Sequence, residues 1–154
     1  MAIDFTAEHA QELELYFPRL KGTNYVPSSP QDRHYNCHAF AMGEIDRRWD
    51  TIRTAGVYWP EGVPLIPTLD AFHQAYATRG YIPCNDGQIE MGFAKVAIYV
   101  KNGEVSHTAL QLADGRWHSK LGSGIDIVHA IEALEGTGYG HVASFMKKTI
   151  LTKH

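Results

Sequence analysis

The chain has 154 residues and a formal net charge of −3 at pH 7, with 44% hydrophobic and 20% charged residues. This length suffices for one well-buried core and is too short for two ordinary domains, so we expect a single domain over residues 1–154. Lysine and arginine are scattered and form no basic stripe, which argues against binding to nucleic acid or to an anionic membrane surface.

The N-terminal region is predicted to form one helix followed by an irregular segment. Thr6 can cap a helix that runs through about Tyr16, and Pro18 ends it. Residues 22–33 contain two prolines and two serines without periodicity, which indicates a surface loop.

A second helix is predicted to begin at Cys37, with Asn36 as its N-cap. Five residues follow helical spacing from this point: Cys37, Phe40, Ala41, Ile45 and Trp49. The thiol therefore lies in the first turn, at the positive end of the helix dipole. Such a position favours the thiolate and hence nucleophilic chemistry.

A third helix is predicted from Thr68 to Gly80, and strands follow it. Residues 93–100 are β-branched and aromatic, 105–112 form a second such run, and Asn102-Gly103 between them is a strong hairpin signal. The pattern predicts an antiparallel pair.

The C-terminal third is predicted to extend this pair. Asp114-Gly115 would turn the chain into a third strand over 116–120, which gives a meander. Asp126 can cap a helix through Leu134, and residues 141–146 would form the last strand. Helices followed by a small antiparallel sheet define an α+β protein.

The two cysteines differ in context. Cys37 has the nucleophile position, whereas Cys84 precedes the turn Asn85-Asp86-Gly87 and is expected to be a packed or half-exposed thiol. The first residues show no basic segment followed by an apolar stretch, and no run approaches a membrane span. We therefore expect a cytoplasmic protein with both thiols reduced, while delivery as an effector stays open.

A nucleophilic cysteine needs an imidazole that takes its proton and a third group that fixes the tautomer of that imidazole. His107, near the start of the central strand of the meander, is the candidate base. If Asp114 and Gly115 form a two-residue turn, residue 111 pairs with residue 118. Alternation then places five residues on one face: His107, Ala109, Gln111, His118 and Lys120.

This face supplies the candidates for the third group. We take His118 as the first choice for the orienting residue, with Gln111 and Asp126 as alternatives. Lys120 can instead hold an anion or a substrate carbonyl. A β-bulge would reverse the assignment of faces.

The order of these residues resembles the papain-like fold, especially the compact NlpC-type and CHAP amidases. In those families the cysteine follows an Asp or Asn, as Asn36 precedes Cys37 here, and the third residue is a His, Asn or Gln about a dozen residues after the base, as His118 is after His107. The match covers residues 36–120. The wider strings YNCHAFA, KVAIY, SHTALQLADGRWHSKLG and LEGTGYG also resemble an uncharacterised bacterial family that spans nearly the whole chain.

The resemblance implies a cysteine-dependent hydrolase or acyltransferase that acts on an amide bond through a thioester intermediate. Cys37 would attack the carbonyl, His107 would be base and then acid, and His118 would orient it. The backbone N–H of Cys37, with the Asn36 side chain, would stabilise the oxyanion. A peptidase, an amidase, a deamidase and a transglutaminase all use these groups, with a peptide or amide substrate and no cofactor.

Two other classes stay open. One is a non-catalytic papain-like module that recognises a protein partner through the aromatic loop 57–64. The other is a zinc protein, because His34, Cys37 and His38 form H-x-x-C-H and could be completed by His107 or His118.

Overall fold

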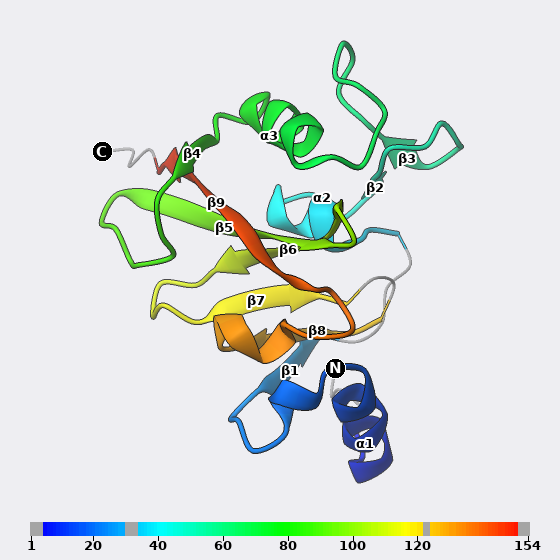
Figure 1. Cartoon of the computed structure of the whole chain (residues 1–154), viewed down its shortest axis with the longest axis vertical. Coiled ribbons are helices and arrows are strands. Elements are labelled where there is room, and N and C mark those ends of the chain that lie inside the picture. Colours follow the sequence, from blue (N-terminus) through cyan, green and yellow to red (C-terminus); the bar gives the residue numbers. More distant parts are fainter. Residues whose placement is uncertain (1–4, 30–33, 122–123, 151–154) are drawn as a thin grey trace.

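The computed structural model describes residues 5–29, 34–121 and 124–150 of the chain (Figure 1). The helices within these residues are α1 (Ala7–Tyr16), α2 (Cys37–Ala41), α3 (Leu69–Ala77) and the short 3-10 helices η1 (Pro18–Leu20) and η2 (Ile131–Leu134). The strands are β1 (Val26–Ser29), β2 (Arg48–Trp49), β3 (Val57–Tyr58), β4 (Ile82–Cys84), β5 (Phe93–Lys101), β6 (Glu104–Gln111), β7 (Trp117–Lys120), β8 (Asp126–His129) and β9 (His141–Thr149).

One antiparallel sheet organises the molecule. Its seven strands lie in the order β1-β8-β7-β6-β5-β9-β4, and β2 and β3 form a separate parallel pair. The expected α+β class is confirmed. The strands of the predicted meander, β5, β6 and β7, occupy the middle of the sheet, and β9 pairs with β5.

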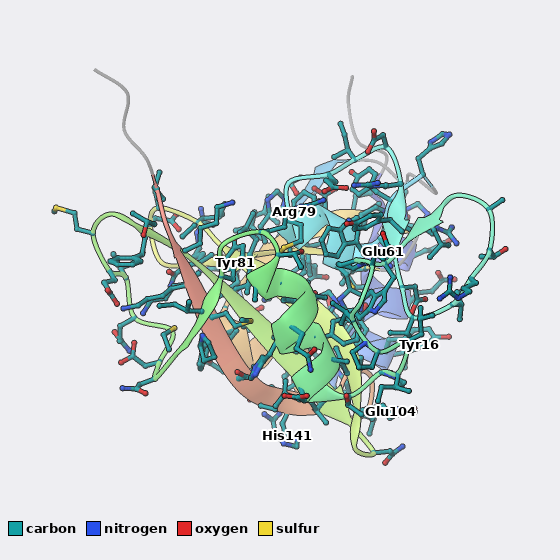
Figure 2. The ribbon with its side chains drawn as sticks, turned by 90° about the horizontal axis from the view of Figure 1, so that it is seen from above. Tyr16, Glu61, Arg79, Tyr81, Glu104 and His141 are labelled. Atoms are coloured by element: carbon teal, nitrogen blue, oxygen red, sulfur yellow. The ribbon has the colours of Figure 1, made fainter. Side chains whose placement is uncertain are left out.

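Each face of the sheet carries its own core. On one face, α3 places Phe72, Ala75 and Tyr76 against Val96, Ile98 and Met146. Seen from above, α3 lies across the long strands of the sheet (Figure 2). On the other face, η1 and η2 cover a second cluster, whose buried members are Phe17, Leu20, Ala97, Tyr99, Ala109, Trp117, Ile127, Ala133 and Leu134. The α2 helix packs on the α3 side, because its Ala39 and Ala41 belong to the first core.

The first hairpin matches the prediction. Lys101 pairs with Glu104, and the two residues between them have positive φ, 52° at Asn102 and 80° at Gly103. Two consecutive positive φ values define the turn type that Asn-Gly favours. This turn fixes β6 beside β5.

The second hairpin differs from the prediction by one residue. The backbone N–H of Leu112 donates to the Arg116 carbonyl, so the loop between them has three residues, 113–115. Gly115, the last of these, has φ 93°. Residue 110 therefore pairs with His118, and Gln111 with Trp117. A three-residue loop ending in a left-handed glycine is the next commonest hairpin after the two-residue turn. The slip exchanges the two faces of β7 relative to β6.

Among the helices, α1 begins after its Thr6 cap and α3 after its Thr68 cap, as predicted. The α2 helix is shorter than its periodicity suggested and ends at Ala41, so Trp49 lies on β2. The helix predicted from Asp126 is wrong.

Residues 126–129 instead form β8, which pairs with both β7 and β1, and only η2 is helical. Strand β1 also replaces part of the loop predicted over 22–33, of which 30–33 lie outside the described residues. Its proline occupies an edge strand, where the missing N–H costs least. None of the helices in the described ranges is long and apolar enough to cross a membrane.

Candidate active site

Asn36 fixes the start of α2. Its Oδ1 accepts hydrogen bonds from the backbone N–H groups of Ala39 and Trp49, both at 3.1 Å, and its Nδ2 donates to the Trp49 carbonyl at 2.8 Å. The side chain therefore caps the helix and ties it to β2. One of the two Nδ2 hydrogens is engaged in the bond to the Trp49 carbonyl, and the role of Asn36 as an oxyanion donor stays a prediction.

Cys37 follows directly and is buried, with 5% of its surface exposed. The backbone N–H groups of Thr108 and His38 lie in hydrogen-bonding position to the sulfur and lower its pKa, but burial is the larger effect and raises the pKa to about 12. The thiolate expected from the helix dipole is thus not the resting form. Desolvation outweighs the few partial charges of one short helix.

His107 lies on β6, fully buried, on the sheet face opposite to α2 and α3. Its Nε2 is 2.9 Å from Ser119 Oγ, Ser119 Oγ is 2.6 Å from His129 Nε2, and His129 Nδ1 is 2.7 Å from the Ala130 carbonyl oxygen. These contacts form one continuous chain, which we call the histidine relay: His107, Ser119, His129 and the Ala130 carbonyl.

The other ring nitrogen of His107 is the exception in this buried cluster. Nδ1 is inaccessible to solvent and has no hydrogen-bond partner. A buried polar atom without a partner costs free energy and requires an explanation, of which a catalytic role is one. Burial, followed by the charges of His38 and His129, lowers the pKa of His107 well below its usual value. The ring is therefore neutral and has a lone pair that can accept a proton, while the lowered pKa makes it a weaker base than a free imidazole.

Tyr139 holds the His107 ring in place. The two rings are stacked, 4.1 Å apart and 4° from parallel, and Tyr99 packs edge-on at 5.3 Å. Tyr139 belongs to the string LEGTGYG, in which Gly136 and Gly140 bond to each other. A Cβ at Gly140 would collide with the Val100 carbonyl oxygen. The glycines of this motif thus let the chain close over the histidine.

Cys37 is linked to His107 only indirectly, through the backbone of the next residue in the chain. The thiol sulfur meets the N–H of Thr108, the residue after His107, and the charge of a Cys37 thiolate would raise the pKa of Tyr139, the ring stacked on His107. His107 Nδ1 itself has no hydrogen-bond partner, so the thiol and this ring nitrogen are not hydrogen-bonded. Catalytic hydrogen bonds are often long or misaligned before substrate binds.

His118 does not share a face with His107, so that prediction is wrong. The cause is the one-residue register of the second hairpin, which puts Ser119 in the predicted place. His118 Nε2 is 2.9 Å from Asp126 Oδ2 and 2.7 Å from Ser28 Oγ, and Phe40 packs edge-on against its ring at 4.7 Å.

This outer cluster, His118, Asp126 and Ser28, resembles a serine triad only in composition. In a triad the histidine bonds the serine through one nitrogen and the carboxylate through the other. Here both partners meet the same nitrogen, so the ring cannot pass a proton between them. The arrangement is a hydrogen-bonded cluster around one ring nitrogen.

The remaining predicted residues serve other contacts. Gln111 Nε2 donates to the Gly87 carbonyl at 2.6 Å and anchors the loop before β5. Lys120 is fully buried, donates to the Gly124 carbonyl and lies 5.0 Å over the Tyr35 ring. Gly122, which ends the string SHTALQLADGRWHSKLG, lies outside the described residues.

His38 is buried on the α3 side of the sheet. Its Nδ1 contacts the hydroxyls of Thr108 at 2.9 Å and Tyr76 at 3.0 Å, and burial lowers its pKa to about 4. His34, its partner in the predicted zinc motif, is exposed. The described residues contain no group of three or more His, Cys, Asp or Glu side chains that could hold a metal ion.

A groove of about 490 Å³ lies in the aromatic loop region, lined by residues between Ile52 and Leu65. Trp59 closes this loop by donating to the Pro64 carbonyl, and its ring packs on Phe72, which in turn packs on His38 next to the thiol. Glu61, on the groove, lies on the side of α3 away from Tyr81 (Figure 2). The groove is thus connected by packed rings to the residues around Cys37.

Sequence reasoning missed Ser119, His129 and Tyr139. Ser119 stands twelve positions after His107 (119 − 107 = 12), and only the face assignment excluded it. His129 was missed because residues 126–134 were predicted to be a helix, whereas 126–129 form β8. Tyr139 was missed because nothing in the sequence except the surrounding glycines distinguishes it from other tyrosines.

Comparison with known families identifies the chain. Residues 27–147 match the family described as Domain of unknown function (DUF7689), so the chain belongs to that family. No curated protein and no solved structure matches it significantly. The matched region contains α2, the histidine relay and Tyr139.

Proposed function

We propose that this protein is a papain-like cysteine hydrolase or acyltransferase in which Cys37 is the nucleophile and His107 is the base. The observation that carries the proposal is the unpartnered Nδ1 of His107, a buried neutral nitrogen beside the peptide that contacts the thiol. The order of helix-borne cysteine and strand-borne histidine supports it.

The chemistry would start from a neutral pair. As Cys37 Sγ attacks an amide carbonyl carbon, its proton passes to His107 Nδ1, and the imidazolium then protonates the departing amine. The acyl group stays on sulfur as a thioester. Water or a second amine, deprotonated by His107, attacks the thioester and releases the thiol. The backbone N–H groups around Cys37 are the candidate donors to the oxyanion.

A non-catalytic module is the second candidate, and one observation favours it. Cys37 is 5% exposed and its pKa is about 12, so the resting thiol is neither accessible nor ionised. In that case the groove in the aromatic loop would be the functional surface.

Trapping the acyl-enzyme separates these two functions. The probe is p-nitrophenyl acetate, an activated ester whose acetyl group a nucleophilic thiol accepts. The catalytic proposal predicts a burst of p-nitrophenolate and an acetyl group on Cys37 by mass spectrometry, removed by hydroxylamine. The burst is expected in Cys84→Ala and not in Cys37→Ala.

Cys84 is a suitable internal control because it is the second free thiol and is half-buried near the Asp86 carbonyl. Acetylation of Cys84 at the same rate as Cys37, with no burst, would contradict the catalytic proposal and favour the module.

A further inference from the structure

The donor and acceptor of each hydrogen bond in the histidine relay can be assigned in turn, starting from the Ala130 carbonyl. The Ala130 carbonyl can only accept, so His129 Nδ1 carries the hydrogen of their 2.7 Å contact. Burial lowers the pKa of His129 to about 4, so the ring is neutral and its Nε2 is an acceptor. The Ser119 hydroxyl must then donate to His129.

The same reasoning continues to His107. A serine hydroxyl has one hydrogen, and that hydrogen is used toward His129. Ser119 Oγ can therefore only accept from His107 Nε2, which makes His107 the tautomer with hydrogen on Nε2. Nδ1, the atom without a partner, is left with its lone pair.

We infer that Ser119 and His129 are positioning residues that hold His107 in the tautomer able to accept a proton at Nδ1. Neither residue touches the thiol; both act through His107. The inference rests on the proposed function, because the free nitrogen is useful only if Cys37 delivers a proton to it. The role differs from that of a single amide or carboxylate partner, since a serine alone could donate or accept and needs His129 to set its direction.

Burial and ring packing both favour a single tautomer of His107. Ser119 is fully buried and His129 is 2% exposed, so water does not compete for their hydrogen bonds. Tyr139 and Tyr99 prevent the His107 ring from turning to exchange its nitrogens. A neutral serine and two neutral imidazoles also avoid placing a net charge in this core.

The first test uses the wild-type chain and no variant. Two-dimensional ¹⁵N–¹H NMR of histidine side chains distinguishes a protonated ring nitrogen from a bare one. At pH 7, His107 is expected to carry hydrogen on Nε2 and none on Nδ1, and His129 the reverse. Hydrogen on His107 Nδ1 would overturn the inference.

Variants then test the consequence for Cys37. In His129→Ala the Ser119 hydrogen is free to bond His107 Nε2, and in Ser119→Ala the constraint is lost. Both are expected to slow iodoacetamide labelling of Cys37 at pH 7 about tenfold, by analogy with the loss of a partner that orients a metal-binding histidine. His129→Gln offers an amide oxygen to Ser119, so labelling within about threefold of wild type is expected.

His107→Ala in the same series separates the two claims. If His107→Ala is slow while Ser119→Ala and His129→Ala match wild type, the inference fails and the proposed function stands. If His107→Ala itself matches wild type, the proposed function fails, and the tautomer measured in the wild-type chain alone decides the inference.

Discussion

Two hydrogen-bonded histidine clusters use consecutive residues of β7, His118 and Ser119, which point to opposite faces of the sheet. The clusters differ in burial and in the charge of their members. Ser119 joins the histidine relay, which is neutral and fully buried. His118 joins the outer cluster, where its side chain is 20% exposed and pairs with the carboxylate of Asp126. The comparison teaches that burial, more than residue type, decides which histidine can be a base with a fixed tautomer.

The largest difference between the clusters is expected in acid. Burial lowers the pKa of His38 and His129 to about 4 and that of His107 well below its usual value. Because the unfolded chain binds these protons at higher pH, their contribution to the free energy of unfolding is complete above about pH 6.5 and decreases as pH falls toward 4.

With three such histidines, the free energy of unfolding should fall by roughly 4 kcal/mol per pH unit near pH 5, measured by urea denaturation. In His129→Gln the slope should be about one third smaller. A free energy of unfolding that is the same at pH 7 and pH 5 would show that these rings are not buried as neutral groups.

A substitution at Gly140 should disturb the packing around the histidine relay without removing any of its side chains. Gly140→Ala places a Cβ against the Val100 carbonyl oxygen and displaces the segment that carries Tyr139. Gly43 has a similar φ, 78° against 80°, with open space around it, so Gly43→Ala measures the cost of the backbone conformation alone.

We expect Gly43→Ala to lower the free energy of unfolding by about 1 kcal/mol and Gly140→Ala by about 3 kcal/mol or more, measured by urea denaturation. Equal losses for the two variants would mean that the contact at Gly140 relaxes at no cost.

The smallest effect is expected in the outer cluster. Ser28 is exposed, and its hydroxyl contacts His118 and Asp126. Ser28→Ala should lower the free energy of unfolding by about 1 kcal/mol or less. This cluster faces α2, where Phe40 packs on His118, but it is separate from the histidine relay, so labelling of Cys37 should stay at the wild-type rate if His107 is the base. A severalfold loss of labelling would indicate that the outer cluster supports the thiol after all.

Much of the fold was predictable from local signals. The caps Thr6, Asn36 and Thr68 each start a helix, and Asn102-Gly103 forms the first hairpin, because these residues satisfy backbone groups or accept positive φ within a few positions. The sheet edges were not predictable. Strands β1 and β8 are short and gain their stability from each other and from β7, which are long-range contacts.

The site shows the same division. The positions of Cys37 at the start of a helix and of His107 on a strand were predictable, since both are local properties. Their partners depended on register, and one extra loop residue exchanged His118 for Ser119. The pKa of Cys37 was predicted in the wrong direction because burial, a property of the whole fold, exceeds the effect of the helix terminus.

The pH dependence of Cys37 labelling tests the central claim most directly, in wild type, His107→Ala and the matched control His118→Ala. A thiol of pKa about 12 that reacts unaided becomes roughly tenfold faster per pH unit between pH 6 and 9. If His107 takes the proton, wild type and His118→Ala should have nearly flat profiles in this range, because the ring stays neutral throughout. His107→Ala should be about a hundredfold slower at pH 6 and show the steep profile. A steep profile shared by all three proteins would contradict the assignment of His107 as the base for Cys37.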